Sequence, residues 1–529
     1  MRATLQRHER LLLYLAVFLS GMTTLAVEVS ASRLLGSVFG TSNLVWTNII
    51  GLILLYLALG YFIGGRFADR RPSYAWFYGL ITLSAFTCAL IPLLSRPILS
   101  IASRAVVEAR AGLALGSFLT VLILFALPVT LLGMISPFSV KLAVSNVDEA
   151  GRIVGRLYAV GTLGSLLGTF LPTLVLIPWL GTTETFLTFS AVLFLIGLVG
   201  LWTYRGNQAA IALLTLPLLA FSLPLRGQSL HSAYSDDFTV LFEDESAYNY
   251  IQVQEDVNGY RYLFLNEGQG IHSQWHPTQI VYNRTWSYFL NAPYFNAPPF
   301  TPSDVQSIAV IGLAAGTIPR QHIAIYGDIP IDGVEIDPEI VQVGADYFQM
   351  NAEFMPSLTV YVQDGRYVLN QLERPYTLIA IDAYRPPYIP WHLTTVEFFA
   401  EVREHLSENG VVAINVGRTN TDRRLVDALT VTLQAVYPSV HTLDVPQTFN
   451  TILVASRQPT DAQNLQANLA NLPTDANPLL RDVLTRGVQS IVPTATTGTL
   501  FTDNHAPVEW LVDSLVVNFL LSEDLEQIR

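Results

Sequence analysis

The sequence predicts an N-terminal bundle of transmembrane α-helices, followed by a small β-hairpin element and a Rossmann-like α/β domain of the methyltransferase type. Three observations lead to this fold class. The first part of the chain contains six apolar stretches of membrane-spanning length, and 51% of the 529 residues are apolar. Residues 1–226 carry 15 basic and 7 acidic side chains, whereas residues 227–529 carry 14 and 35. Apolar strands then alternate with helical stretches after residue 306. We therefore expect domains at 1–226, 227–300 and 301–529.

The membrane domain is predicted from apolar stretches of about 20 residues, the length that a helix needs to cross a bilayer. A shorter seventh stretch at 209–225 contains Pro217 and Pro224, so its status stays open. The first stretch runs too long for a cleavable signal peptide and is followed at once by further spans. The six predicted spans lie near 11–32, 44–65, 74–95, 113–135, 157–180 and 183–204.

The basic residues of the membrane domain predict its orientation in the bilayer. If the spans alternate, one side collects most of the Arg and Lys, and the positive-inside rule makes that side cytoplasmic. Six spans place the acidic domain in the cytoplasm, whereas seven would export it. We expect a multi-pass cell-membrane protein with a cytoplasmic soluble domain. The basic residues on the expected inner side are Arg2, Arg7, Arg10, Arg66, Arg70, Arg71, Lys141, Arg152 and Arg156.

The charge of the second part bears on its partners. It is acidic and contains no Lys, which argues against a nucleic acid because phosphate-backbone binding rests on clustered basic residues. The negative field would favour cationic substrates, although it can equally serve solubility alone. The single cysteine, Cys88, permits no intrachain disulfide. The expected partners are the lipid bilayer and a small molecule, and homo-oligomerisation stays open.

The β element is predicted from YNYIQVQEDVNGYRYLFLNEGQG at residues 248–270. Two alternating strands flank Asn258-Gly259, a dipeptide that favours the positive backbone angles of a two-residue hairpin turn. The α/β domain follows, with the predicted strands SIAVIGLAAG, IDGVEID, LTVYVQD, YTLIAID and GVVAINVG. Helices are expected at PEIVQVGADYF and at TTVEFFAEVREHLSENG, the latter ending at Gly410. This alternation is typical of a doubly wound parallel sheet.

Three consecutive strand ends carry small or acidic residues. Gly312 and Gly316 bound a loop in which small residues let backbone N–H groups approach a ligand, although Ala314 replaces the middle glycine of the usual dinucleotide fingerprint. Glu335 ends the second strand, where a carboxylate can accept both hydroxyls of a ribose, and Asp364 ends the third, where it could accept from an adenine amino group. Each acid alone is more often a cap, but three such ends in register predict a nucleoside site.

The fourth strand delivers Asp382 to its carboxyl end, at the start of DAYRPPYIPWHLTT. Ligands bind at strand ends in open α/β sheets, so Asp382 is either a reacting group or a helix cap. The rings behind it would wall off a desolvated acceptor pocket, or would only pack a proline-rich loop. These rings are Tyr384, Tyr388, Trp391 and His392.

The order and spacing of these motifs over about residues 238–460 resemble the spermidine synthases, which use decarboxylated S-adenosylmethionine as co-substrate and need no metal. The resemblance implies that the nucleoside is bound by Gln269, Gly312, Gly316, Glu335, Asp364 and Gly365. It also implies that Asp382 is the catalytic base. The stretches SGMTTLAVEVSASRLLGSVFG, LYLALGYFIGGRFADRR and TDNHAPVE are similar to those of the membrane-fused spermidine synthase-like proteins of bacteria.

The departures from this family fall on the acceptor side. Ala315 replaces the acid of the glycine-rich loop, and Arg385 replaces the second aspartate of the D-x-x-D-P motif. VPQTFN at 445–450 lacks the family's tyrosine, and PTQIVYNRTWSYF shows no clear Tyr-His/Gln-Glu motif. A cationic diamine would be repelled by Arg385 rather than attracted. The sequence does not identify the acceptor. The candidate residues for contacting it are Tyr384, Arg385, Tyr388 and His392.

Three functions remain in competition. The first is a membrane-anchored aminopropyl transferase of polyamine biosynthesis that acts on an amine. The second is a methyltransferase that uses intact S-adenosylmethionine on a membrane-accessible acceptor, which the loss of the acid at Ala315 favours. The third is a non-catalytic transporter or sensor, because six or seven spans are more than an anchor needs.

Overall fold

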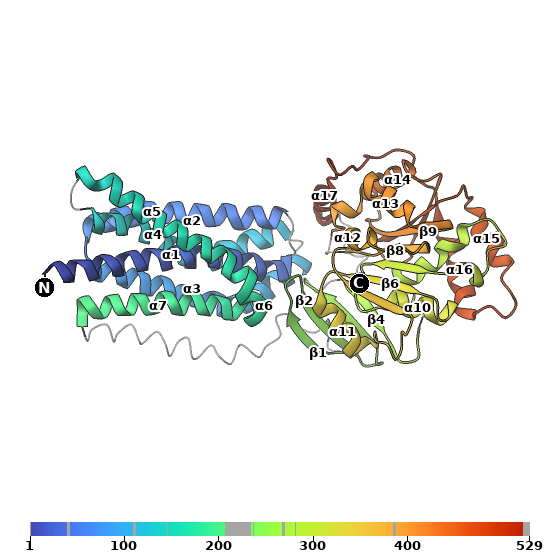
Figure 1. Ribbon diagram of the computed structural model, residues 1–529, viewed down its shortest axis with the longest axis horizontal. Coiled ribbons are helices and arrows are strands. Elements are labelled where there is room, and N and C mark those ends of the chain that lie inside the picture. Colours follow the sequence, from blue (N-terminus) through green and yellow to red (C-terminus); the bar gives the residue numbers. More distant parts are fainter. Residues whose placement is uncertain are drawn as a thin grey trace. The chain divides into compact units, whose positions relative to one another are not determined.

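The computed structural model describes residues 2–39, 43–108, 113–144, 147–206, 234–235, 237–266, 270–280, 282–384 and 388–521. The chain divides into two compact units, Met1–Ser232 and Ala233–Arg529. The first is helical and the second contains all the described strands (Figure 1). The predicted seventh span at 209–225 and the site candidates Gln269 and Arg385 lie outside the described residues.

The six predicted membrane-spanning stretches are all helical. Among the described residues, six helical segments are long and apolar enough to cross a bilayer: Glu9–Gly36, Val45–Arg70, Tyr74–Ser95, Gly116–Ala143, Ala150–Leu180 and Thr182–Arg205. The fifth continues through a π-helical turn at Pro172–Leu176, because the proline removes a backbone donor. The helices are α1 (Arg2–Phe39), α2 (Asn43–Arg70), α3 (Tyr74–Glu108), α4 (Leu113–Ala143), α5 (Ala150–Leu171), α6 (Ile177–Leu180) and α7 (Thr182–Arg205).

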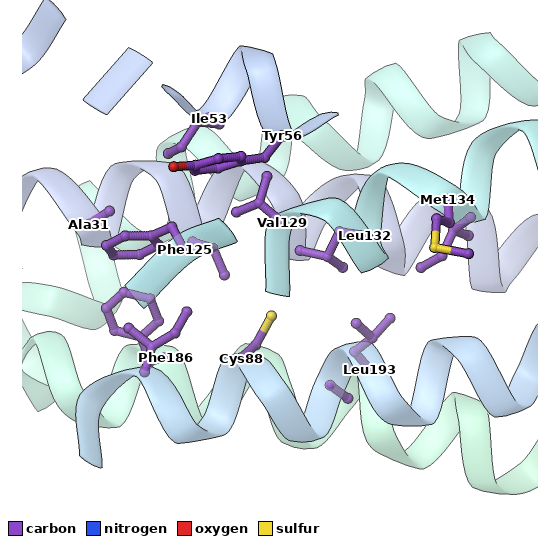
Figure 2. Close-up of a cluster of buried hydrophobic side chains, with 14 of the residues drawn as sticks. Ala31, Ile53, Tyr56, Cys88, Phe125, Val129, Leu132, Met134, Phe186 and Leu193 are labelled. Carbon is purple, nitrogen blue, oxygen red and sulfur yellow. The ribbon is translucent and has the colours of Figure 1, made fainter. Parts of the chain in front are cut away.

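Small residues let the helices of this unit approach closely. A side chain on Gly60 would meet the backbone of Thr130 and Gly133 on α4, and one on Gly164 would meet the backbone of Phe18 on α1. These glycine positions therefore pack helix directly against helix. The helices of this unit enclose an apolar core that includes Tyr56 of α2, Phe125 of α4 and Phe186 of α7 (Figure 2). The Cys88 thiol is fully buried in the same core.

The second unit begins with a small antiparallel sheet in the order β1-β2-β3-β4. The predicted hairpin is confirmed, because β2 and β3 pair, but its turn is not the predicted two-residue turn. The N–H of Asp256 donates to the carbonyl of Tyr260 and the N–H of Gly259 donates to the carbonyl of Asp256, so the loop has three residues, Val257, Asn258 and Gly259. Of these three, Gly259 has the positive φ, at +83°. Two further strands extend the hairpin to four. The strands are β1 (Phe238–Glu245), β2 (Tyr250–Asp256), β3 (Arg261–Leu265) and β4 (Ile271–Trp275).

The main sheet has eight strands in the order β12-β10-β11-β9-β8-β5-β6-β7. The five predicted strands form its parallel part, β9 to β7, and this confirms the doubly wound core. Three antiparallel strands at the β12 edge were not predicted. The strands are β5 (Ile308–Ile311), β6 (Ile331–Glu335), β7 (Leu358–Val362), β8 (Tyr376–Ile381), β9 (Leu406–Gly417), β10 (Ser439–Asp444), β11 (Asn450–Ser456) and β12 (Ile491–Val492).

Helices cover both faces of this sheet (Figure 1). One face packs against α12 (Gly365–Leu369), α13 (Val396–Glu404), α14 (Arg424–Gln434) and α17 (Val508–Leu521). The other packs against α9 (Thr285–Tyr288), α10 (Thr317–Tyr326), α15 (Gln463–Ala470) and α16 (Pro478–Ser490). By contrast, α11 (Pro338–Phe348) packs with the small sheet.

One predicted boundary was wrong. The helix at 394–410 ends at Glu404 rather than at Gly410, because Leu406 already pairs with Tyr376 of β8. Gly410 instead lies within β9, where a side chain would meet the Tyr376 carbonyl oxygen at 2.7 Å.

Candidate functional site

The candidate site lies at the carboxyl ends of β8, β5, β6 and β7. From β5 the chain crosses through α10 to β6 on one side, while β8 lies on the other side, so the topology switches between β5 and β8. Gly312 occupies this switch point with a φ of +87°, and a side chain there would lie 2.5 Å from the carbonyl oxygen of Asp382 and the nitrogen of Ala383. Only glycine fits, and ligands of doubly wound sheets bind at such a point.

Glu335 ends β6 as predicted and is 8% exposed. Its Oε2 accepts from the backbone N–H of Ala314 at 2.9 Å, and its Oε1 accepts from those of Ile336 at 2.9 Å and Asp337 at 3.2 Å. Burial raises the pKa of Glu335 to about 7, while these N–H donors favour the ionised form. The carboxylate therefore ties the glycine loop to β6 and holds Ala314 at a φ of +47°.

The glycine loop also rests on the small sheet. The N–H of Ala315 donates to Oγ of Ser273 at 2.9 Å, and the N–H of Gln274 donates to Oγ1 of Thr317 at 3.0 Å. His272 precedes these contacts as the extra residue of a β-bulge, and its buried Nε2 has no partner among the described residues. Burial lowers the pKa of His272 to about 4, so the ring is neutral at physiological pH.

Asp364 follows β7 and combines two roles. Its Oδ1 caps α12 by accepting from the N–H groups of Arg366 at 3.0 Å and Tyr367 at 3.1 Å. Its Oδ2 lies 2.8 Å from Nε2 of His392. The cap anticipated from sequence is therefore present, and His392 lies on the Asp364 side of the site rather than beside Asp382. Gly365 is required here because a side chain would meet Ile311 of β5.

Arg366 joins this part of the site to the TDNHAPVE segment. Its guanidinium donates to both carboxylate oxygens of Glu401 on α13 and to both of Asp503, with Nη1 of Arg366 2.8 Å from Oδ1 of Asp503. The same Oδ1 accepts from Oγ1 of Thr395 at 2.6 Å, and Nη1 also donates to the carbonyl of His392 at 3.2 Å. The arginine lowers the pKa values of both acids. This network fixes the end of the loop that starts at Asp382.

Asp382 follows β8, and its own N–H donates to the carbonyl of Ile311 at 2.8 Å. Its Oδ1 accepts from Nδ2 of Asn415 on β9 at 2.8 Å, and the indole of Trp286 also donates to the carboxylate. Burial raises the pKa of Asp382 to about 7, against the effect of these two donors. The group is therefore a desolvated carboxylate that can take up a proton near neutrality.

The aromatic rings of the loop that follows Asp382 do not together line one side of an acceptor pocket. The hydroxyl of Tyr384 is buried, and burial followed by the charge of Asp382 raises its pKa. Tyr388 is 7% exposed and packs in the core with Phe398 and Val402 of α13. Of the four rings, Tyr384 lies near enough to Asp382 to feel its charge. The acceptor roles of Tyr384, Tyr388 and His392 stay predictions.

Sequence reasoning missed Trp286 and Asn415, which contact Asp382, and Asn450, which donates to Asn415. It also missed His272, the neighbour of the Ser273 that binds the glycine loop. One signal was present: Asn415 is the single polar residue inside the apolar strand VVAINV. Trp286, by contrast, reaches Asp382 from about a hundred residues away in the chain, which no local pattern indicates. Among the described residues, no three His, Cys, Asp or Glu side chains are grouped so that they could hold a metal ion.

Comparison with known proteins places this site in a family context. Residues 298–461 match the Spermine/spermidine synthase domain, a segment that contains Glu335, Asp364 and Asp382. The predicted resemblance to spermidine synthases is thus confirmed for this part of the chain. The narrower resemblance of the membrane half stays a prediction.

Two curated relatives and one solved structure are similar to the chain. A "Probable polyamine aminopropyl transferase" of Bifidobacterium longum is 30% identical over 286 residues, which cover 51% of this chain and 61% of the relative. A "Polyamine aminopropyltransferase" of Vibrio vulnificus is 32% identical over 147 residues, covering 27% and 47%. A probable spermidine synthase from Corynebacterium glutamicum aligns with a TM-score of 0.39 at 19% identity, covering 49% of this chain and 99% of its own. The chain thus spans less than two thirds of either curated relative.

Proposed function

We propose that this chain, whose residues 298–461 form a spermidine synthase-like domain, transfers an aminopropyl group from decarboxylated S-adenosylmethionine to a small-molecule amine. The observation that carries the proposal is the joint position of three acids at one edge of the sheet. Glu335 and Asp364 end strands on one side of the switch point, and Asp382 ends the strand on the other. A nucleoside bound along this edge would present its sulfonium to Asp382.

The residues fit the parts of such a co-substrate. Glu335 would accept from the ribose hydroxyls and Asp364 from the adenine amino group, each in addition to the N–H groups it already binds. The N–H-lined loop from Gly312 to Gly316 would lie against the nucleoside. His272 supplies a further buried nitrogen, three residues after Gln269.

In the proposed reaction the amine nitrogen attacks the aminopropyl carbon that is bonded to sulfur. The new C–N bond forms as the C–S bond breaks, and the bonding electrons leave with the sulfur of the adenosyl thioether. The proton lost by the amine passes to the carboxylate of Asp382, which must therefore be ionised at the start. Trp286 and Asn415 would hold the carboxylate in place, while the partly buried setting limits competition from water.

In this proposal the amine that accepts the aminopropyl group is not a simple diamine. A diamine needs an anionic partner for its far ammonium group, but Arg385 stands at the position of the family's second aspartate. We expect putrescine to be a poor acceptor and Arg385→Asp to improve its use. Efficient spermidine formation by the unchanged protein would contradict this expectation.

A methyltransferase is the second candidate, because Ala315 offers no carboxylate to the aminopropyl ammonium group. Mass spectrometry of the products formed with each donor and a panel of amines separates the candidates. The proposal predicts a product heavier by one aminopropyl group with the decarboxylated donor. A methylated product with intact S-adenosylmethionine would support the second candidate. Binding of both donors without any product would favour a non-catalytic sensor or transporter.

The proposed setting is the cell membrane, with the lipid bilayer around the six apolar helices and the soluble domain in the cytoplasm. The basic residues support this orientation through the positive-inside rule, provided that the chain crosses the bilayer six times. Protease accessibility of the soluble domain in sealed inside-out vesicles tests it, since an exported domain would be protected there.

A further inference from the structure

Asn415 lies on β9 and is 6% exposed. Its Nδ2 donates to Oδ1 of Asp382 at 2.8 Å, and its Oδ1 accepts from Nδ2 of Asn450 at 2.9 Å. Asn450 begins β11 and pairs with Gly417, two residues beyond Asn415 on β9, so both amides project from the same face of the sheet. Asn450, Asn415 and Asp382 thus form one chain of hydrogen bonds across three neighbouring strands.

The chain of hydrogen bonds has a direction. A carboxamide donates only through its nitrogen and accepts only through its oxygen. Because Asn450 donates to the oxygen of Asn415, that oxygen is held toward β11 and the NH₂ group is held toward Asp382. Asn415 therefore meets Asp382 as a donor, and a donor favours the ionised form of a carboxylate over the protonated form.

We infer that Asn415 and Asn450 are positioning residues that keep Asp382 ionised and in one orientation, so that it can accept the proton of the attacking amine. The inference rests on the proposed function, and it goes beyond it by naming the groups that set the pH range of the reaction. It follows from two distances, the burial of Asn415 and the pairing of β9 with β11. Neither residue needs to touch a substrate.

The described groups that stabilise the ionised form of Asp382 are uncharged donors. Trp286 of α9 donates an N–H that does not titrate, and Gly312 of β5 brings no side chain. Among the described residues, Tyr384 is the titratable group whose ionisation is coupled to the charge of Asp382, and its raised pKa keeps it neutral through the physiological range. Arg385 lies outside the described residues. Burial pulls the carboxyl toward its neutral form, and the amide and the indole oppose that pull.

The first test is Asn415→Leu in the full-length protein, which keeps a side chain of similar size but removes the donor. Infrared difference spectra against Asp382→Asn follow the carboxylate band of Asp382 through a pH titration without any turnover. Loss of a hydrogen bond to a charged group should move the midpoint up by about one to two pH units. The acidic limb of kcat/KM should move by the same amount, so activity at pH 6.5 falls more than activity at pH 8.5.

Asn450→Leu provides a second variant in case the first does not fold. It keeps the donor but frees the amide of Asn415 to rotate, so we expect a smaller upward shift of the same midpoint. Asn468→Leu is the matched control: the side chain of Asn468 is buried like that of Asn415, but its amide donates to the carbonyls of Tyr294 and Asn296 instead. This control should lower thermal stability and leave the midpoint unchanged.

An unchanged infrared midpoint in both Asn415→Leu and Asn450→Leu would overturn the inference, as would an equal shift in Asn468→Leu. Failure of the proposed function gives a different result. If no donor yields a transfer product but the infrared midpoint rises as expected, the control of Asp382 ionisation by the two amides stands and only the assigned reaction falls.

Discussion

Glu335 and Asp382 are two acids that look alike in the sequence but are held in different ways. Both follow apolar strands at the same edge of the sheet, and burial raises the pKa of each to about 7. Glu335 is held by three backbone N–H groups, two of them from the residues directly after it. Asp382 is held by the side chains of Trp286 and Asn415, which come from distant parts of the chain.

This difference separates a group that shapes a binding loop from a group that can exchange a proton. Backbone donors are rigid and leave Glu335 as the fixed end of the glycine loop, suited to accept hydroxyl groups of a ligand. Asp382 follows the strand on the other side of the switch point, where a reacting amine would arrive in the proposed reaction. Binding and proton transfer are therefore predicted to respond separately to substitutions at the two strand ends.

The largest effect is expected from Asp382→Asn. The amide keeps the shape of the side chain but cannot take the proton, so the rate of aminopropyl transfer should fall by about 10² to 10⁴. Calorimetric affinity for the adenosyl thioether product should stay within about threefold, because the nucleoside contacts lie on the other strands. Product formation is followed by mass spectrometry.

A purely capping role of Asp382 predicts the opposite result. Asn is as good a helix cap as Asp, so turnover and melting temperature would both stay close to those of the unchanged protein. Retained turnover would return Asp382 to a structural role, and another group would have to take the proton of the amine.

The next largest effect is expected from Glu335→Gln. An uncharged amide is a weaker acceptor for ribose hydroxyls than a carboxylate is. If its NH₂ group takes the place of Oε2, two donors face each other, because the N–H of Ala314 donates to that oxygen in Glu335. We expect affinity for the adenosyl thioether to fall by about ten- to a hundredfold, measured by calorimetry. Glu353→Gln, at an exposed position of the same domain, serves as the control. Unchanged affinity in Glu335→Gln would refute the nucleoside assignment.

A smaller effect is expected from Asp503→Asn. This change removes one of the two carboxylates that bind Arg366, and it weakens the tie between the loop end at Thr395 and the Thr502–His505 turn. Because Asp503 is 40% exposed, we expect a loss of only about 1 kcal/mol in stability. Its lowered pKa means that this contribution is present at neutral pH and is lost in acid.

Thermal unfolding of the full-length protein measures the effect of Asp503→Asn. The control is Asp461→Asn, an exposed acid at the start of the α15 region. A destabilisation equal to that of the control would show that the TDNHAPVE segment does not hold the site together.

The sequence was sufficient to predict the elements that depend on local pattern. The six apolar stretches, the hairpin around Asn258-Gly259 and the strands that lead to Glu335 and Asp382 all follow from hydrophobic spacing and turn chemistry. The cap at Asp364 was also within reach, because an acid directly before a helical turn is a common start signal.

The parts that escaped prediction depend on pairing between distant segments. The three antiparallel strands arise where β11 returns beside β9, and the early end of α13 arises because Leu406 pairs with β8. The partners of Asp382 have the same origin. A single sequence shows that Asn415 interrupts an apolar strand, but only the order of the strands shows which carboxylate it meets.

The central claim is that Glu335 binds the nucleoside and Asp382 takes the proton. The most direct test of this claim is the pH dependence of kcat/KM for the donor between pH 6 and 8. A base with a pKa of about 7 must be ionised, so the value for the unchanged protein should rise about tenfold over this range. Glu335→Gln should show a lower kcat/KM that still rises with pH, whereas the residual activity of Asp382→Asn should lose that rise. A flat profile for the unchanged protein, or a rise that persists in Asp382→Asn, would contradict the assignment of Asp382 as the base.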